Sequence, residues 1–93
     1  MKLTFYDDDS FEEFTSWMLE DKKIFKKLLS LIKDIKRNPY DGIGKPEQLK
    51  HELSGYWSRH INKEHRLVYE ILEHENKNEN TLVIISCKKH YEI

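Results

Sequence analysis

Residues 56–72 read YWSRHINKEHRLVYEIL. Two runs rich in aromatic and β-branched residues, 56–61 and 65–72, flank the polar triplet 62–64. This pattern is typical of two antiparallel strands joined by a tight turn. The middle of the chain is therefore predicted to form a β-hairpin.

The first strand of this hairpin is predicted to have two different faces. Successive side chains in a strand point to opposite sides, so Trp57 and Ile61 share one face. We expect that face to pack in the core. The other face carries Tyr56, Ser58 and His60.

The N-terminal part is predicted to hold one strand and two helices. Residues 2–6 alternate between polar and apolar, as a strand does. Ser10 and Glu13 fit a capping box that starts a first helix of roughly ten residues. A second helix is expected over residues 21–37, because apolar side chains recur there every three or four residues. It should end at Asn38-Pro39, since proline disfavours a helical conformation in the residue before it. The apolar stripe of this helix consists of Ile24, Leu28, Leu31 and Ile35, widened by Phe25 and Ile32.

The C-terminal part is predicted to add further strands. Residues 49–53 are expected to form a short strand and residues 81–88 the last one. Segment 73–80 is entirely polar and is expected to be a hairpin loop. The resulting order, β-α-α-β-β-β-β, predicts an α+β fold: two N-terminal helices packed on a twisted, mostly antiparallel sheet. With no linker or repeat, residues 1–93 are expected to form a single domain.

Charge is segregated along the chain although the formal net charge is only −1. Residues 1–21 carry one lysine against seven acids, whereas residues 22–72 carry twelve lysines and arginines against six acids. Residues 73–93 are close to neutral. A basic middle segment is compatible with a face that binds a polyanion. The helical lysines could equally form a solvated helix surface, and both interpretations remain open.

Composition also bears on the compartment. Cys87 is the single cysteine, so no internal disulfide can form and a reducing cytoplasm is the simplest location. No apolar run is long enough for a membrane span, and no signal-peptide pattern is present at the start. We therefore expect a cytoplasmic protein with no membrane partner.

Three side-chain types in the chain could together cleave RNA without a metal. The ribose 2′-hydroxyl is itself the nucleophile, so an enzyme must remove its proton, stabilise charge on phosphorus and protonate the leaving 5′-oxygen. A carboxylate such as Glu47 can accept the proton and the Arg66 guanidinium can pair with phosphoryl oxygens. The His90 imidazole can donate a proton near neutral pH. Each residue alone would more often be an ordinary exposed side chain.

Four segments, taken in order, closely resemble the YoeB toxins of the RelE/ParE superfamily. They are GKPE (44–47), LSGYWSR (53–59), HRLVY (65–69) and the near-terminal HY (90–91). The resemblance covers nearly the whole chain. It implies the α+β fold already expected from the order of elements.

The resemblance also implies roles for individual residues. Glu47 matches the general base and His90 the general acid of such toxins. Arg66 matches the residue that stabilises the phosphorane, and Tyr91 the one that helps to place the scissile phosphate or its neighbouring base.

A second group of cations is implied to contact RNA or the ribosome. Lys50 and Arg59 match positions that face the RNA, and Lys50 could add positive charge at the scissile phosphate. Lys45 is expected to belong to the same group of cations that bind RNA or the ribosome. The alternative for all three is ordinary surface charge on a strand.

The activity implied by the resemblance is that of a toxin in a type II toxin–antitoxin system. Such a toxin enters the ribosomal A site and cuts the mRNA codon there, with no metal or other cofactor. The implied partners are the 70S ribosome, mRNA and a YefM-like antitoxin, and a homodimer is plausible. Two departures are the longer polar loop at residues 73–80 and the extension Glu92-Ile93.

Two other functions remain as alternatives. One is a non-catalytic ParE-like toxin that inhibits DNA gyrase, although such toxins generally lack the pair formed by Glu47 and His90. The other is a catalytically lapsed module that only binds an antitoxin.

Overall fold

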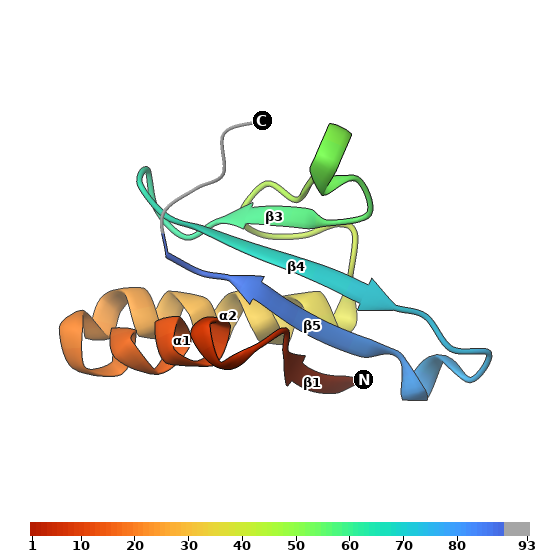
Figure 1. The fold of residues 1–93 in the computed structure, drawn as a ribbon, viewed down its shortest axis with the longest axis horizontal. Coiled ribbons are helices and arrows are strands. Elements are labelled where there is room, and N and C mark those ends of the chain that lie inside the picture. Colours follow the sequence, from red (N-terminus) through yellow and green to blue (C-terminus); the bar gives the residue numbers. More distant parts are fainter. Residues whose placement is uncertain (89–93) are drawn as a thin grey trace.

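Two helices cover one face of a five-stranded sheet in the computed structural model, which describes residues 1–88 (Figure 1). The elements are β1 (Lys2–Phe5), α1 (Asp8–Glu20), α2 (Lys22–Arg37), β2 (Glu47–Gln48), β3 (Trp57–His60), β4 (Arg66–Leu72) and β5 (Thr81–Ser86). Short 3₁₀ turns lie at His51–Leu53 and Lys77–Glu79. The predicted order and the α+β class are confirmed.

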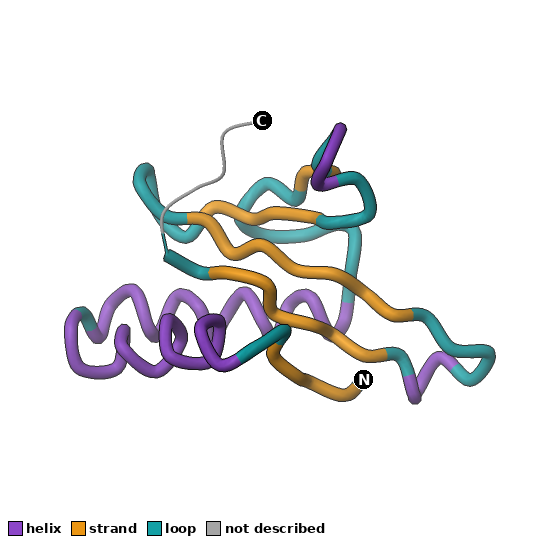
Figure 2. The backbone as a smooth tube through the Cα atoms, in the orientation of Figure 1, coloured by secondary structure: helices purple, strands orange, loops and turns teal. Residues whose placement is uncertain are grey.

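The strands lie in the order β1-β5-β4-β3-β2. Within residues 1–88, β1 and β5 pair in parallel, whereas the other neighbouring strands pair antiparallel. Figure 2 shows β1, from the start of the chain, beside the last strand. The sheet is thus mostly antiparallel, as predicted, with a parallel pair at one edge.

Within residues 1–88, neither helix is both long and apolar enough to cross a membrane.

Both helices begin at aspartate caps. The Asp7 carboxylate accepts a hydrogen bond from the Ser10 N–H at 2.9 Å, and the Ser10 hydroxyl oxygen accepts one from the Asp7 N–H at 3.0 Å. The predicted capping box of Ser10 with Glu13 is therefore wrong, because Asp7 supplies a charged acceptor one turn earlier. The Asp21 carboxylate caps α2, which ends at Arg37, immediately before Asn38-Pro39, as predicted.

The core lies between the helices and the sheet. Leu28, Leu31 and Ile35 of α2 are completely buried, which confirms the predicted apolar stripe. Ile61 is buried and Trp57 packs partly buried against the same cluster, also as predicted. The core cluster comprises Trp17, Leu28, Leu31, Ile32, Ile35, Ile61, Leu67, Tyr69, Leu82, Ile84 and Cys87.

The segment after β2 differs from the prediction of a strand over residues 49–53. Pairing with β3 ends soon after Gln48, with a hydrogen bond from the Leu49 N–H to the Tyr56 carbonyl at 2.9 Å. His51 then adopts a φ of +58° and the chain enters a 3₁₀ turn. This positive φ is incompatible with a continuing strand.

Arg59 is fully buried, so the expectation that it faces RNA is wrong. Its partner in β4 is Leu67, and both side chains point toward the helices. The guanidinium and Nε donate to five oxygens: Asp34 Oδ2 (2.6 Å), Asn38 O (2.6 Å), Asp41 O (2.8 Å), Tyr69 Oη (3.1 Å) and Ile43 O (3.2 Å). These bonds use the five N–H donors of an arginine. Arg59 therefore holds the loop after α2 against the sheet.

Gly42 allows this loop to pass close to Asp34. Its φ is +119°, and a Cβ atom at this position would collide with the Asp34 carboxylate. The same carboxylate accepts from the Ile43 N–H at 3.0 Å and from Arg59. Only glycine satisfies both the backbone angle and the close approach.

Replacing Arg59 with methionine should destabilise the fold strongly. The change leaves Asp34 and several carbonyl oxygens without their donor, and loss of one partner of a buried ion pair costs about 3–5 kcal/mol. The free energy of unfolding from urea titration is the measurement.

Arg37→Met is the matched control, because the Arg37 side chain is 76% exposed and lies 4.0 Å from the same Asp34 carboxylate. A change below about 0.5 kcal/mol is expected there. Equal losses in the two variants would contradict the role assigned to Arg59.

Asp34 should make stability depend on pH at the acidic end. The Ile43 N–H, and then the Arg59 guanidinium, hold the pKa of the Asp34 carboxyl below its ordinary value of 3.8. The group therefore contributes stability that is present above that value and is lost as pH falls through its lower folded-state pKa. The difference in unfolding free energy between wild type and Asp34→Asn should shrink below about pH 4. A difference that stays constant between neutral and acidic pH would contradict this.

Candidate functional site

Glu47 and Arg66 lie on the sheet face that points away from the helices. Glu47 pairs with Ser58, and His60, two residues further along β3, pairs with Arg66. Cross-strand partners share a face, and so do residues two apart in a strand. The register therefore places Glu47, Ser58, His60 and Arg66 together, opposite to the face that buries Arg59.

The two charged groups form a loose ion pair. Arg66 Nη1 lies 3.9 Å from Glu47 Oε2, and the side chains are 25% and 58% exposed, respectively. This distance is too long for a hydrogen bond. Exposed pairs of this kind contribute little to stability. Both groups are thus available to a ligand on this face.

Lys50 and His51 lie next to Glu47. Together with Gln48 they line a small hollow of about 220 Å³. The exposed Lys50 brings positive charge to the hollow that Glu47 lines. His51 was not among the predicted site residues, because its location depends on a positive φ that no sequence pattern signals.

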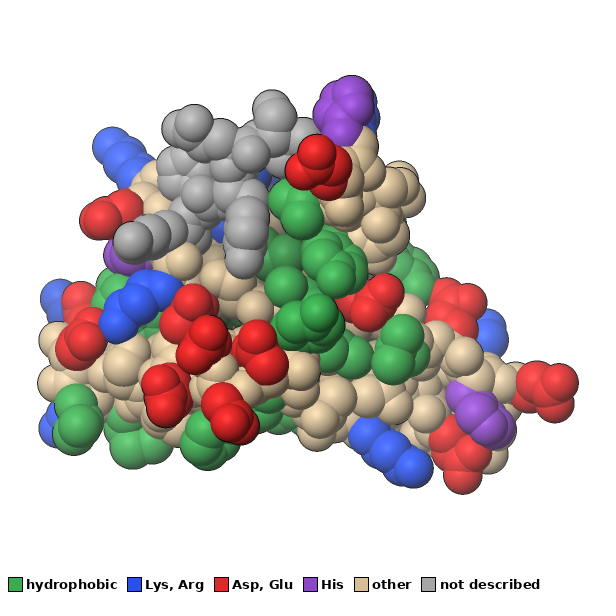
Figure 3. Space-filling model, viewed as in Figure 1, with side chains coloured by type: hydrophobic (Ala, Val, Ile, Leu, Met, Phe, Trp, Pro, Cys, Tyr) green, Lys and Arg blue, Asp and Glu red, His purple; other side chains and the backbone are tan. Residues whose placement is uncertain are grey.

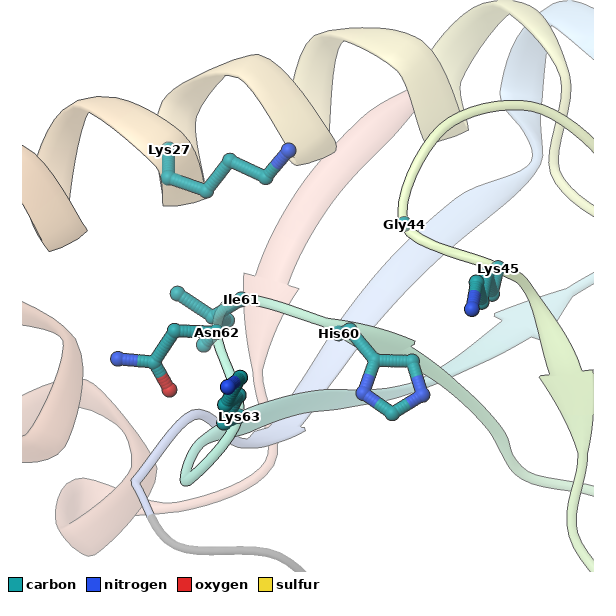
Figure 4. Close-up of a pocket in the computed structure, with 7 residues that line it drawn as sticks. All are labelled: Lys27, Gly44, Lys45, His60, Ile61, Asn62 and Lys63. Atoms are coloured by element: carbon teal, nitrogen blue, oxygen red, sulfur yellow. The ribbon is translucent and has the colours of Figure 1, made fainter.

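Lys45 lies at a different hollow, close to the first. It comes two residues before Glu47 and lines a space of about 620 Å³ with His60, Lys27 and Lys63 (Figure 4). The structure thus places Lys45 and Lys50 at two separate hollows. It does not bring Arg59 to either of them.

His90 and Tyr91 lie outside the described residues, so their predicted roles remain predictions. The chain just before them is held by α1. One Glu13 oxygen accepts from the Ser86 hydroxyl at 3.0 Å and from the Cys87 N–H at 2.9 Å. Glu13 therefore binds the end of β5 and does not cap α1.

Two further contacts join the end of β5 to α1. The Trp17 indole N–H donates to the Cys87 carbonyl at 3.0 Å. The Lys88 ammonium donates to Ser16 Oγ at 2.7 Å and lies 2.8 Å from Glu20 Oε2. Residues 86–88 are thus tied to one helix at several points.

Cys87 is a core residue, as predicted. Its side chain is completely buried, and burial raises the pKa of the thiol to about 12, with a smaller contribution from Glu13. Such a thiol is almost entirely protonated at neutral pH and is a poor nucleophile. The Cys87 thiol is therefore not a candidate catalytic nucleophile.

The helices differ in charge. Figure 3 shows acidic side chains gathered over α1, which contains Asp8, Asp9, Glu12, Glu13 and Glu20. The helix α2 instead carries seven lysines and arginines against the single acid Asp34. Five of its lysines are exposed: Lys22, Lys23, Lys26, Lys33 and Lys36.

Within residues 1–88, no cluster of three histidine, cysteine or acidic side chains is arranged to hold a metal ion.

Solved bacterial toxins share this fold. A YoeB/ParE toxin from Agrobacterium tumefaciens has a TM-score of 0.89 at 38% identity, over 98% of this chain and all of that one. The YoeB toxin of Staphylococcus aureus, solved with YefM and as a dimer, has a TM-score of 0.82 at 46% identity, over 98% of each chain. The fold is that of the RelE/ParE toxin superfamily.

Sequence comparison narrows this class to one family. The toxin YoeB of Escherichia coli K12 is 46% identical over 91 residues, which is 98% of this chain and all of that protein. Residues 6–91 match the model of the YoeB-like toxins of bacterial type II toxin–antitoxin systems. The chain therefore belongs to the family of YoeB-like toxins, as its sequence motifs indicated.

Removing the Glu13 carboxylate should loosen the end of β5. Glu13→Ala leaves the Cys87 N–H and the Ser86 hydroxyl without their acceptor, and hydrogen bonds to charged groups contribute about 1.5–3 kcal/mol. The free energy of unfolding should fall by a similar amount. Glu13→Gln keeps one acceptor oxygen and should retain most of the stability. Glu12→Ala, an exposed neighbour on α1, serves as the control, and an equal loss there would contradict the role of Glu13.

Proposed function

We propose that this protein is an endoribonuclease that enters the ribosomal A site and cuts mRNA there. The proposal is supported by membership of the YoeB-like toxins. The single structural observation that carries it is the ion pair of Glu47 and Arg66, which puts a candidate base and a candidate phosphate ligand 3.9 Å apart on an open face.

In the proposed reaction the ribose 2′-oxygen attacks the adjacent phosphorus. Glu47 takes the 2′-hydroxyl proton as the O2′–P bond forms, and Arg66 pairs with the phosphoryl oxygens as they gain charge. His90 gives a proton to the 5′-oxygen as the P–O5′ bond breaks, while Tyr91 helps to place the phosphate. The products are a 2′,3′-cyclic phosphate and a 5′-hydroxyl end. No cofactor takes part in this scheme.

The loose contact between Glu47 and Arg66 suits this exchange of partners. A phosphate bound by Arg66 in the planar, two-point manner of guanidinium groups would replace the weak contact with Glu47. The freed carboxylate could then accept the 2′-hydroxyl proton. Acid–base catalysis contributes typically about 10²–10⁴-fold, and charge stabilisation by preorganised groups contributes about 10²–10³-fold for each donor.

Lys50 and Lys45 are proposed to contact RNA or the ribosome. Lys50 is exposed and lines the hollow beside Glu47, so it can add positive charge near the scissile phosphate. The buried Arg59 makes no such contact in this proposal. It acts by holding the loop that leads to Lys45 and Glu47.

The proposed partners are the 70S ribosome, mRNA and a YefM-like antitoxin, and the place of action is the cytoplasm. A YoeB relative from Staphylococcus aureus forms a complex with YefM and has been solved as a dimer. We infer the same kinds of assembly for this chain. An acidic antitoxin segment that folds over the face carrying Arg66 and Lys50 would neutralise the site while covering a large surface.

Mapping of 5′ ends in a translating extract tests the activity. Purified protein should produce cuts inside codons that occupy the A site, with 5′-hydroxyl ends. Glu47→Gln and His90→Gln should each reduce cutting by about 10²-fold or more, because each removes one proton-transfer group. Glu75→Gln, an exposed acid in the polar loop, should cut like wild type.

Other outcomes would overturn the proposal. Intact mRNA with protein bound to ribosomes would indicate a lapsed enzyme. Intact mRNA, no ribosome binding and altered DNA supercoiling would indicate a gyrase inhibitor. Loss of folding in Glu47→Gln, seen by circular dichroism, would make Glu47 a structural residue.

A further inference from the structure

Three lysines from separate parts of the chain surround one hollow. Lys27 comes from α2, Lys45 from the loop before β2, and Lys63 from the turn between β3 and β4. The hollow has a volume of about 620 Å³, and none of its lining residues is a carboxylate. Figure 4 shows Lys27 reaching toward the loop that carries Gly44, with His60 between Lys45 and Lys63.

Within residues 1–88, none of the three lysines of this hollow forms an ion pair with a carboxylate. The ion pairs of residues 1–88 involve Arg37, Arg59, Arg66, Lys88 and two histidines, but not Lys27, Lys45 or Lys63. Like charges held around a common space repel one another and attract an anion. The hollow is therefore suited to a negatively charged group.

The hollow adjoins the face of Glu47 and Arg66. His60, one of its lining residues, is the cross-strand partner of Arg66. Directly opposed residues in antiparallel strands have Cα atoms about 4.5–5.5 Å apart. Lys45 is two residues from Glu47. An RNA strand whose phosphate is bound by Arg66 would thus need to extend by only about one strand spacing to reach the hollow.

The backbone around Lys45 is constrained in a way that keeps it at the hollow. The Gly44 carbonyl accepts a hydrogen bond from the His60 N–H at 2.7 Å, which attaches the loop to β3. Lys45 itself has a φ of +53°, a conformation that glycine or asparagine adopts more readily than lysine. The chain thus carries a lysine where the backbone favours a smaller residue.

We propose that this hollow binds phosphodiester groups of the RNA backbone that flank the cleavage site. The inference rests on the proposed function, since it extends the path of the RNA beyond Glu47 and Arg66. Continuity with that face favours RNA over an acidic peptide. Lys27 and Lys63 are then phosphate ligands, and neither takes part in the chemical step.

Binding of an uncleavable RNA tests the subsite without requiring catalysis. The probe is a fluorescent single-stranded oligoribonucleotide with 2′-O-methyl groups throughout, titrated by anisotropy over a range of salt concentrations. The variant Lys27→Gln/Lys63→Gln should bind about tenfold more weakly at low salt. The slope of log K against log salt concentration, with K the association constant, is negative, and its magnitude should decrease by about 1.4. Two phosphate contacts are lost, and each contact on a single strand contributes about 0.7.

A charge-matched control separates the hollow from general surface charge. Lys33→Gln/Lys36→Gln removes the same charge from exposed positions of the same helix. It should leave the affinity and the salt slope close to those of wild type. Equal losses in both variants, or no binding by wild type, would overturn the subsite. Thermal unfolding of each variant confirms that the comparison is between folded proteins.

Two further measurements distinguish this proposal from its rivals. If Lys27→Gln/Lys63→Gln weakens binding of polyglutamate but not of RNA, the hollow takes an acidic peptide and the proposal fails. Failure of the proposed nuclease would instead appear as uncut mRNA in the extract, with the RNA-binding difference between the two double variants retained.

Discussion

The buried guanidinium of Arg59 is the interaction on which the arrangement of this protein depends. Removing a charge from water is costly, and it is tolerated here because five oxygens surround the group. Those oxygens belong to α2, to the loop that follows it and to β4, while Arg59 itself lies in β3. One side chain therefore sets the position of the loop relative to the sheet. Since that loop continues into Lys45 and Glu47, the location of the candidate base follows from a contact on the opposite face.

One face of the sheet carries the residues that fix the structure, and the other face carries the candidate site. Residues that alternate inward, such as Arg59 and Tyr69, fix the structure, whereas Glu47, His60 and Arg66 alternate outward and remain accessible. A short β2 keeps the edge of the sheet open, so the hollow lined by Lys45 lies beside β3 rather than under a further strand. The basic surface thus begins at the sheet and continues onto α2, while the acids gather on α1.

Periodicity predicted the order of elements and the stripe of α2 because apolar spacing reflects burial directly. The same alternation that put Trp57 and Ile61 inside also puts Arg59 inside. The expectation that Arg59 faces RNA came instead from the family resemblance, and buried arginines are too rare for the alternation to have overruled it. The spacing of Ser10 and Glu13 predicted a capping box, but Asp7 and Ser10 have the same spacing and form the box instead. Local spacing alone does not decide between the two pairs. The hollow of Lys27, Lys45 and Lys63 joins segments distant in the chain, so no local motif could predict it. The family resemblance predicted catalytic roles for Glu47 and Arg66, and those roles stay predictions. The strand register places the two side chains close together, with Arg66 Nη1 3.9 Å from Glu47 Oε2.

The parallel pairing of β1 with β5 has a consequence for how the protein is made. Residues 2–5 are synthesised before every other strand of the sheet, whereas their partners at 81–84 emerge from the ribosome after the other strands. The Trp17 indole N–H likewise has its hydrogen-bond acceptor, the Cys87 carbonyl, only after residue 87 has been synthesised. Contacts between such distant segments slow folding, because the chain must close a long loop before they form. A nascent chain interrupted before β5 therefore has an unpaired β1 and an incompletely covered α1, and the fold is completed only once β5 has been made.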